Sequence, residues 1–227
     1  MPWDDWIRTV EVEPSLYAAD FSRLGEQIDV LLRAGVSVFH YDVGDGQFVS
    51  PITIGPIVLK DLSPAIHDAG GRVDVHMMTV SPEHHFAALA EAGADSVTVH
   101  LEACPDLPNV VHLAREQELQ VGLAFNPQSD PVRAAALAEE LHVDLVLCMS
   151  INPGYSGQEF MLEALGRIAE LRRRLPREIH VQVDGGIGPD NVRAVHDAGA
   201  DLLVAGTAVF GQEDLTGAYL RLVRDLA

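Results

Sequence analysis

The sequence predicts an α/β fold of the (β/α)8 TIM barrel type, on the evidence of a recurring phrase and of regularly spaced apolar runs. Ala-Gly followed by a short apolar run occurs at residues 34–40, 92–100 and 198–204. Each copy indicates a helix end, a glycine that stops the helix, and a buried strand. The 227 residues are 48% hydrophobic and contain no segment that resembles a linker, so we expect one domain over residues 1–227.

Eight short runs, rich in Val and Leu and apolar on both faces, predict parallel strands that helices cover on the outside. In chain order, the expected strands span residues 9–16, 36–42, 72–78, 96–102, 120–126, 144–151, 179–184 and 201–205. A helical pattern follows each strand, and the expected helix starts are Asp20, Ser81, Asp106, Asp130 and Pro189. Eight such units predict a closed barrel. A doubly wound open sheet is the alternative, but no GxGxxG motif follows the first strand.

Net charge and lysine content exclude several classes of function. The formal net charge of −19 argues against nucleic acid or an anionic membrane surface as a partner, because both require clustered Lys and Arg. Lys60 is the only lysine, and the motifs of a Schiff-base aldolase or a Walker phosphate loop do not surround it.

Cysteine usage and hydropathy predict a cytoplasmic protein without a membrane segment. Cys104 and Cys148 lie too far apart for a CxxC motif, and we expect both to be reduced thiols. The first residues are acidic, unlike those of a secretory signal. No apolar run reaches the ~18 residues of a membrane span.

Two imidazoles and two carboxylates stand at three predicted strand ends. His40 and Asp42 end the second strand, His76 ends the third and Asp184 ends the seventh. The active site of such a barrel lies at the C-terminal strand ends, and alternation puts His40 and Asp42 on one face. Two His and two carboxylates are a plausible metal shell, and the carboxylates are also able to move protons. His100 ends the fourth strand and is either a partner of this set or a structural histidine.

Glycine-containing loops follow the last three strands, at residues 152–158, 184–186 and 206–207. Glycines let backbone N–H groups approach a phosphate closely, and a short helix expected at 207–210 would direct its N-terminus there. These loops match the usual phosphate position of an eight-stranded barrel, so we expect a phosphorylated ligand.

In order and spacing, these motifs resemble the ribulose-phosphate 3-epimerase family over residues 14–210. The matching stretches are 14–16, 19–21, 45–49, 53–55, 74–78, 122–127, 149–154 and 204–210. The resemblance implies a barrel of the ribulose-phosphate-binding type and an isomerase of the pentose phosphate pathway that acts on a phosphorylated ketose. It also implies a homo-oligomer, in which Trp3, Trp6 and Ile7 would cover the barrel bottom or a neighbouring subunit.

The resemblance further implies the site residues. One divalent metal ion, usually zinc although iron, manganese or cobalt also serve, would be held by His40, Asp42, His76 and Asp184, without an organic cofactor. Asp42 and Asp184 would be the catalytic acid and base. The implied substrate-binding residues are Ser15, His76, Met78, Met149, Gly154, Tyr155, Ser156, Gly157, Gly185, Gly186, Gly206 and Thr207.

The chemistry of these residues suits the implied reaction. Inverting a carbon next to a ketone requires removing its proton from one face and returning a proton to the other. Two carboxylates can perform this 1,1-proton transfer while a metal ion stabilises the enediolate. The first hypothesis is therefore epimerisation at C3 of D-ribulose 5-phosphate to D-xylulose 5-phosphate. The alternatives are the same reaction on another ketose phosphate, such as D-allulose 6-phosphate, and a catalytically impaired phosphosugar-binding protein.

Three positions depart from the family pattern. Gly44 replaces a methionine expected over the reacting carbons, Gln47 replaces a histidine, and Ser156 replaces a glycine. Loss of the methionine side chain is expected to open the pocket, which would change the substrate rather than the reaction type.

Overall fold

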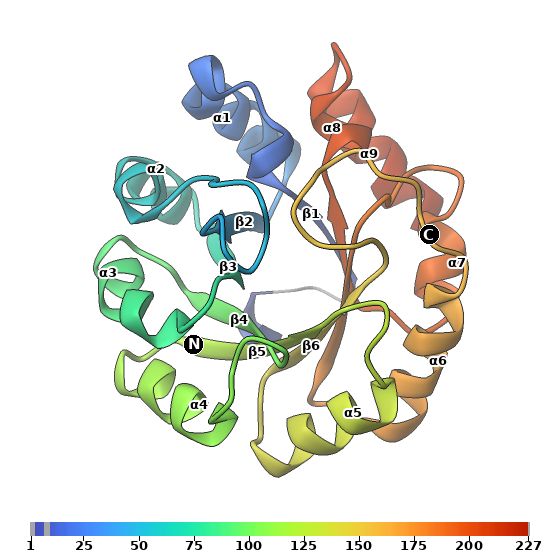
Figure 1. The fold of residues 1–227 in the computed structure, drawn as a ribbon. Coiled ribbons are helices and arrows are strands. Elements are labelled where there is room, and N and C mark those ends of the chain that lie inside the picture. Colours follow the sequence, from blue (N-terminus) through green and yellow to red (C-terminus); the bar gives the residue numbers. More distant parts are fainter. Residues whose placement is uncertain (1–2, 7–9, 227) are drawn as a thin grey trace.

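The computed structural model describes residues 3–6 and 10–226, and its centre is a barrel of eight parallel strands (Figure 1). The strands are β1 (Glu11–Pro14), β2 (Val38–Gly44), β3 (Arg72–Met78), β4 (Ser96–His100), β5 (Gln120–Phe125), β6 (Leu145–Met149), β7 (His180–Asp184) and β8 (Leu202–Ala205). Neighbouring strands pair in parallel from β2 to β8, and β8 pairs with β1. A bridge between Ser15 and His40 joins the end of β1 to β2. The predicted (β/α)8 TIM barrel is confirmed.

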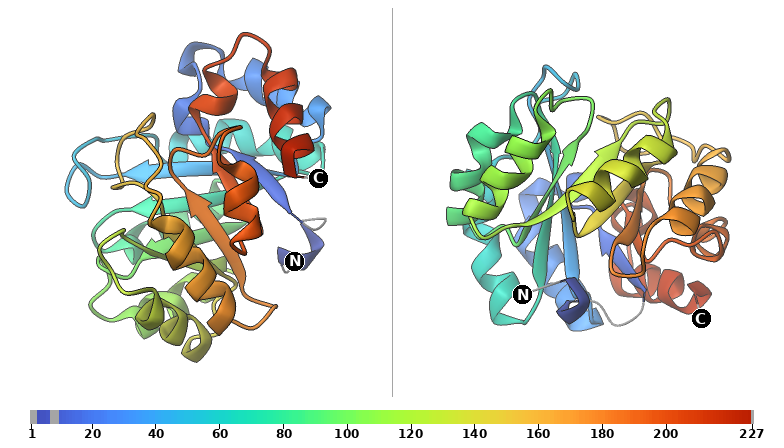
Figure 2. Two further views of the ribbon diagram at one scale, coloured as in Figure 1. Left: turned by 90° about the vertical axis from the view of Figure 1, so that its right-hand side faces the viewer. Right: turned by 90° about the horizontal axis from the view of Figure 1, so that it is seen from below.

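Helices cover the outside of the barrel, as Figures 1 and 2 show. They are α1 (Leu24–Ala34), α2 (Pro56–Asp68), α3 (Phe86–Glu91), α4 (Leu107–Glu116), α5 (Pro131–Glu140), α6 (Ala164–Arg174), α7 (Val192–Asp197), α8 (Thr207–Phe210) and α9 (Leu215–Leu226). Short 3-10 turns are η1 (Trp3–Asp5), η2 (Leu16–Ala18), η3 (Phe21–Arg23) and η4 (Pro82–His85). Within the described ranges, none of these helices is both long and apolar enough to cross a membrane.

The predicted strands overlap the observed ones and differ only at their ends. The first strand begins at Glu11, and residue 9, where it was expected to begin, lies outside the described residues. The predicted glycine stops are present, since Gly35, Gly93 and Gly199 have φ angles of 97°, 93° and 117°. This left-handed conformation ends a helix without the steric cost of a Cβ.

Three of the five predicted helix starts are aspartates that accept backbone N–H groups in a first helical turn. The acceptor and donor pairs are Asp20 with Ser22, Asp106 with Asn109, and Asp130 with Val132. Ser81 precedes η4 without a side-chain cap. Pro189 does not begin a helix: α7 begins at Val192, because residues 188–191 form a turn in which Asn191 accepts the Gly188 N–H.

Trp3 and Trp6 lie inside the N-terminal end of the barrel. Their rings are 4.6 Å apart, and both belong to a buried cluster with the first residues of three strands, Val38, Leu145 and Leu202. The two tryptophans therefore cover the barrel bottom, as one of the two expectations had it. Ile7 lies outside the described residues, and the homo-oligomer stays a prediction.

The inward-facing side chains divide the barrel interior into two kinds of surface. On the side of β1, β2, β3 and β7, they are polar and fully buried, and include Glu13, His40, Asp74 and Gln182. On the side of β5 and β6, they are apolar, as in Ala124, Leu145 and Leu147. Buried polar groups in a barrel core need partners, so the chemistry of the molecule is concentrated on the polar side.

Candidate active site

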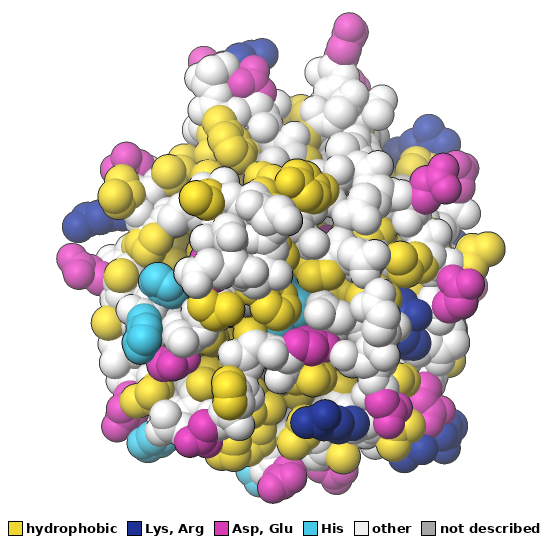
Figure 3. Space-filling model, viewed as in Figure 1, with side chains coloured by type: hydrophobic (Ala, Val, Ile, Leu, Met, Phe, Trp, Pro, Cys, Tyr) yellow, Lys and Arg dark blue, Asp and Glu magenta, His cyan; other side chains and the backbone are white. Residues whose placement is uncertain are grey.

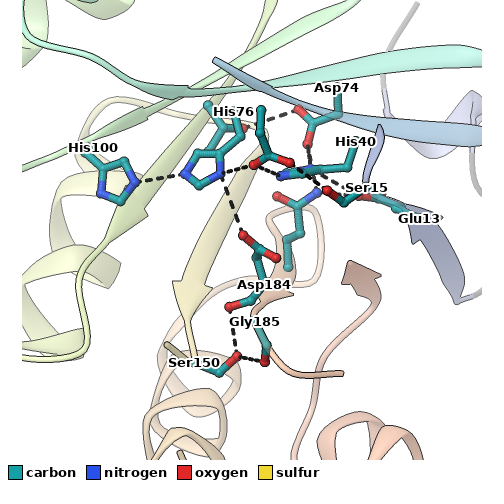
Figure 4. Close-up of polar contacts among 12 residues, drawn as sticks. Glu13, Ser15, His40, Asp74, His76, His100, Ser150, Asp184 and Gly185 are labelled. Atoms are coloured by element: carbon teal, nitrogen blue, oxygen red, sulfur yellow. Dashed lines mark hydrogen bonds and ion pairs between the residues drawn. The ribbon is translucent and has the colours of Figure 1, made fainter. Parts of the chain in front are cut away.

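Three strand ends bring the predicted metal set together at the barrel mouth (Figure 4). His40 and Asp42 come from β2, His76 from β3 and Asp184 from β7. His76 Nδ1 lies 3.1 Å from Asp42 Oδ1 and 3.8 Å from Asp184 Oδ2. His40 Nε2 lies 3.5 Å from Asp42 Oδ1. One possible ligand atom from each residue lies within 4.8 Å of the other three, a spacing that suits one four-coordinate ion.

Asp74 orients His40 toward this set. The Asp74 Oδ2 atom lies 3.1 Å from His40 Nδ1, and Asp74 also accepts hydrogen bonds from Ser96 and Gln182. Because a carboxylate only accepts, His40 Nδ1 carries the proton and donates it. His40 Nε2 is buried and has no hydrogen-bond partner among the described residues. A divalent ion would give this atom a partner, so the residues present fit a metal.

Burial and neighbouring charges separate the proton affinities of the two carboxylates. Burial favours a high pKa for Asp42, but His40 and His76 outweigh it and hold that pKa well below its usual range. Burial and repulsion from Asp42 raise the pKa of Asp184 to about 6. Two carboxyl groups whose environments push their pKa values apart are suited to act as a base and an acid.

Charge also favours the protonated form of His40. Burial lowers the pKa of this imidazole, but Asp42 and Asp74 outweigh that effect and leave the pKa well above 6.5. A metal ion on Nε2 would therefore displace a proton, which couples metal binding to pH.

A cavity opens above these residues and includes nearly every predicted substrate-binding position. Its lining is Ser15, Tyr17, Asp42, Met78, Met149, Ile151, Pro153, Gly154, Tyr155, Ser156, Gly157, Asp184, Gly185, Gly186, Ile187, Val204, Gly206 and Thr207. His76 is not in this lining and is fully buried. Figure 3 shows hydrophobic side chains around the centre of this face, with an acidic one among them, and most charged side chains toward its periphery.

Sequence reasoning missed several residues of the site. Tyr17, Ile151, Pro153, Ile187 and Val204 also line the cavity. Each stands within a few residues of a predicted site position, so proximity to a strand end was the available signal. Asp74 contacts His40 from behind, whereas His100, for which a partner role was one of the two expectations, contacts His76. Alternation was the signal for Asp74, since it precedes His76 by two residues on the same strand.

Two serines hold the catalytic candidates in place. Ser15 Oγ donates to Asp42 Oδ2 at 2.7 Å, which leaves Asp42 Oδ1 toward the histidines. Ser150 Oγ lies 2.8 Å from the carbonyl oxygen of Asp184 and 2.6 Å from that of Gly185, and so anchors the end of β7. Both contacts reduce the side-chain and backbone freedom of the carboxylates.

The loop after β7 requires its two glycines. Gly185 and Gly186 have φ angles of 119° and 64°. A Cβ at Gly185 would lie 2.4 Å from the Ile151 side chain, and one at Gly186 would lie 2.6 Å from the Phe160 backbone nitrogen. Only glycine allows this packing, which brings the loop backbone to the cavity wall.

The structure corrects the expectation that Gly44 opens the pocket. A Cβ at Gly44 would lie 3.0 Å from both Pro51 O and Val49 Cγ2, and 3.2 Å from Thr53 Cγ2. Thr53 also bonds the Gly44 backbone, through Gly44 N to Thr53 Oγ1 at 2.7 Å and Thr53 N to Gly44 O at 3.2 Å. The loop after β2 therefore occupies the space next to Gly44, and Gly44 does not line the cavity.

The other two departures from the family pattern lie on exposed loops. Gln47 is exposed, and its backbone N–H donates to Asp45. Ser156 lines the cavity, and its hydroxyl approaches Gly206 so closely that a Cβ there would lie 3.2 Å from Ser156 Oγ. Ser156 thus adds a hydroxyl to the wall that the glycine loops form.

Solved structures of other enzymes share this fold. A 3-hexulose-6-phosphate synthase from Salmonella typhimurium has a TM-score of 0.72 at 18% sequence identity, over 95% of this chain and 98% of that chain. KGPDC from Streptococcus mutans has a TM-score of 0.73 at 12% identity, over 96% of this chain and 98% of that chain. At such low identity, the likeness shows the fold alone.

Sequence comparisons show to which protein family the chain belongs. The Ribulose-phosphate 3 epimerase family model matches residues 11–210. A ribulose-phosphate 3-epimerase from Bacillus subtilis is 39% identical over 209 residues, which are 90% of this chain and 94% of that protein. One from Synechocystis is 40% identical over 208 residues, which are 89% of this chain and 88% of that protein. The chain therefore belongs to the ribulose-phosphate 3-epimerase family, whose members are isomerases of carbohydrate phosphates.

Proposed function

We propose that this ketose-phosphate epimerase inverts C3 of D-ribulose 5-phosphate and gives D-xylulose 5-phosphate. The observation that supports the proposal is the pair of carboxylates, Asp42 and Asp184, which line one cavity. They approach the same atom, His76 Nδ1, at 3.1 and 3.8 Å. Paired carboxylates at one carbon can remove a proton from one face and return a proton to the other.

The positions of the two carboxylates suit substrate carbons between them. Asp42 lies two residues before the end of β2 and Asp184 ends β7, and β1 and β8 separate these strands around the barrel. A carbon bound between the two side chains would face one carboxylate on each side. The separated pKa values let one group hold a proton while the other accepts one.

We propose that His40 Nε2, His76 Nδ1 and the carboxylates of Asp42 and Asp184 hold a divalent metal ion. Bound there, the ion would supply positive charge for the substrate oxygens that become negative as the proton leaves C3. Zinc suits two imidazoles and two carboxylates, and iron, manganese and cobalt are the alternatives. Elemental analysis of freshly purified protein would identify the ion.

We propose that the glycine loops after β6, β7 and β8 bind the phosphate. Gly185 and Gly186 bring the backbone to the cavity wall, and Ser156 and Thr207 add hydroxyl groups beside them. Gly154, Tyr155, Gly157 and Gly206 complete this part of the lining. Met78 and Met149 line the same cavity and would contact the sugar carbons.

A coupled assay for D-xylulose 5-phosphate tests the reaction. Asp42→Asn and Asp184→Asn should each lower kcat by about 100- to 10,000-fold, because each removes one proton-transfer group. Asp190→Asn is the matched control, since Asp190 is exposed in the loop after β7 and does not line the cavity. Full activity in both site variants would refute the roles of Asp42 and Asp184.

A panel of ketose phosphates, with turnover and proton exchange both measured, separates the alternatives. Turnover of D-allulose 6-phosphate with no turnover of D-ribulose 5-phosphate would identify a different substrate. Binding of a ketose phosphate without exchange of its C3 proton for solvent deuterium would identify a protein that binds the sugar but does not turn it over.

Homo-oligomerisation and a cytoplasmic location stay predictions, and light scattering of the purified protein tests the first.

A further inference from the structure

Behind the proposed metal shell, His76 contacts a second buried histidine, His100, at the end of β4 (Figure 4). His76 Nε2 lies 2.8 Å from His100 Nε2, and the two imidazole rings stack with centroids 5.0 Å apart. His100 Nδ1 lies 3.4 Å from Glu102 Oε2. Both histidine side chains have 0% exposure, whereas the Glu102 side chain is 22% exposed.

Glu102 is a carboxylate with several donors around it. Burial favours a higher pKa, but hydrogen bonds from His100, Ser129 and the Asn126 backbone outweigh it and lower the pKa of Glu102 to about 2. Its Oε1 atom accepts the Asn126 N–H at 2.8 Å and the hydroxyl of Ser129. Glu102 is thus a fixed, charged acceptor that faces His100.

This arrangement determines which nitrogen atoms hold protons. A carboxylate only accepts, so His100 Nδ1 carries a proton and donates it to Glu102. A neutral imidazole that donates from Nδ1 has its lone pair on Nε2, so His100 Nε2 is an acceptor. Two nitrogens 2.8 Å apart need one donor and one acceptor, so His76 Nε2 must be the donor. Once a cation replaces the proton that His76 Nδ1 shares with Asp42, the ring proton that remains is on Nε2, where His100 accepts it.

We propose that His100, held by Glu102, is a positioning residue that fixes the tautomer of His76 and so presents Nδ1 to a divalent cation. The inference rests on the metal site of the proposed function and adds two residues to it. Neither residue lines the cavity, so both act through His76. Partners behind metal-binding histidines orient the ring and increase its basicity, and their loss costs about 10- to 100-fold in metal affinity.

Phe48 covers His100 from the loop after β2. Its ring centroid lies 4.8 Å from that of His100 at an interplanar angle of 47°. The Phe48 backbone N–H donates to Asp45 Oδ1 at 2.8 Å, and Asp45 Oδ2 accepts the Val80 N–H at 2.8 Å. The apolar cover limits access of water to His100, whose Nε2 then has His76 as its partner.

The affinity of the metal-free protein for Co²⁺, measured by calorimetry, tests the inference without any measurement of activity. His100→Phe removes the acceptor for His76 Nε2–H, and Glu102→Ala releases the His100 tautomer. Each should lower the affinity by about 10- to 100-fold. His100→Gln, whose amide oxygen reaches about as far as Nε2, should restore the affinity to within a few-fold of wild type.

Ser129→Ala is the matched control for Glu102→Ala. It removes the other side-chain hydrogen bond of Glu102 and leaves His100 in place, so the Co²⁺ affinity should stay at the wild-type value. Should His100→Phe fail to fold, the pair Glu102→Ala and Ser129→Ala makes the same comparison. A purely structural role would lower the affinity equally in both.

Nitrogen-15 NMR of the metal-free wild type at mildly alkaline pH gives a second reading. His76 Nε2 should carry a proton, and Glu102→Ala should lower the proton occupancy of this atom. A wild type whose His76 Nε2 carries no proton, or equal Co²⁺ affinity in wild type and Glu102→Ala, would overturn the inference. If the wild type itself binds no Co²⁺, the proposed metal site fails, which is a distinct result.

Discussion

The two histidines of the proposed metal shell are held by different chemistry. His40 Nδ1 donates directly to Asp74, a carboxylate with 0% exposure. His76 contacts the neutral imidazole of His100, and the carboxylate behind that ring, Glu102, is 22% exposed. The difference suits the cost of burying charge. The buried carboxylate of Asp74 contacts a metal-binding histidine directly, and other buried hydrogen-bond donors stabilise its negative charge. Nearer the surface, the charge lies one side chain farther away, where loop groups and water solvate it.

The His40 side also holds a second buried carboxyl group. Glu13 from β1 accepts a hydrogen bond from Gln182, whose amide nitrogen also donates to Asp74. Burial, followed by repulsion from Asp74, raises the pKa of Glu13 well above 4.5. The core on this side therefore compensates one carboxylate with donors and raises the proton affinity of the other.

The largest expected effect is on the His40 side. Asp74→Ala removes the acceptor of His40 Nδ1–H, Ser96 and Gln182, and should lower the free energy of unfolding by about 3–5 kcal/mol. Asp74→Asn retains a hydrogen-bond acceptor and should lose less unfolding free energy than Asp74→Ala. Urea unfolding measures the stability of both variants. A loss below about 1 kcal/mol in Asp74→Ala would show that His40, Ser96 and Gln182 do not need the Asp74 carboxylate as an acceptor.

Glu13→Gln should make stability less dependent on pH. The folded protein retains the Glu13 proton, whereas the unfolded chain releases it near 4.5, the ordinary value of this group. As the pH rises above 4.5, the wild type should lose about 1.4 kcal/mol of unfolding free energy per pH unit relative to Glu13→Gln, until the folded pKa is reached. Urea unfolding of both metal-free proteins between about pH 5 and pH 7 measures this slope. Parallel curves would mean that Glu13 is charged in the folded protein.

On the His76 side, the unfolding free energy should depend on pH in the opposite direction to that expected for Glu13. The pKa of Glu102 is lowered from 4.5 to about 2, so the carboxylate stabilises the folded protein above pH 4.5, and this stabilisation is lost as the pH falls through about 2. Wild type should exceed Glu102→Gln by on the order of 1 kcal/mol at neutral pH. Thermal unfolding across this range measures the difference. The exposed Glu159→Gln should match wild type throughout, and a constant gap for Glu102→Gln would contradict the prediction.

The smallest expected effect concerns the cover of the His76 side. Phe48→Leu keeps an apolar side chain but removes the ring contact with His100, and should cost about 0.5–1 kcal/mol. The control is Phe21→Leu, because Phe21 is 49% exposed in η3. Thermal midpoints measure both, and equal shifts would mean that the contact between Phe48 and His100 contributes nothing.

Much of the fold and of the metal set was predictable because both depend on local patterns. Val and Leu runs, the glycines after helices and the alternation of side chains placed His40, Asp42, His76 and Asp184 at strand ends. The same alternation placed Asp74 on the face of His76, but nothing local shows that its neighbour is His40. That contact follows from the register of β2 and β3, in which His40 pairs with Asp74 and Asp42 with His76.

The effect of Gly44 was not predictable from the sequence. Its replacement of a methionine suggests an open pocket, but Val49, Pro51 and Thr53 fold back over it. The start of α7 depended in the same way on the turn that Asn191 closes. Both results come from loop conformations, which contacts with other loops and strands determine.

By itself, the sequence determined the order of the eight strands and helices and the four residues of the candidate metal set, since periodicity and spacing act within one element. Only the tertiary structure decided which groups stand behind His40 and His76, because closing the barrel sets the register in which strands meet. Asp74, Glu13, Gln182 and His100 became neighbours of the site through this closure.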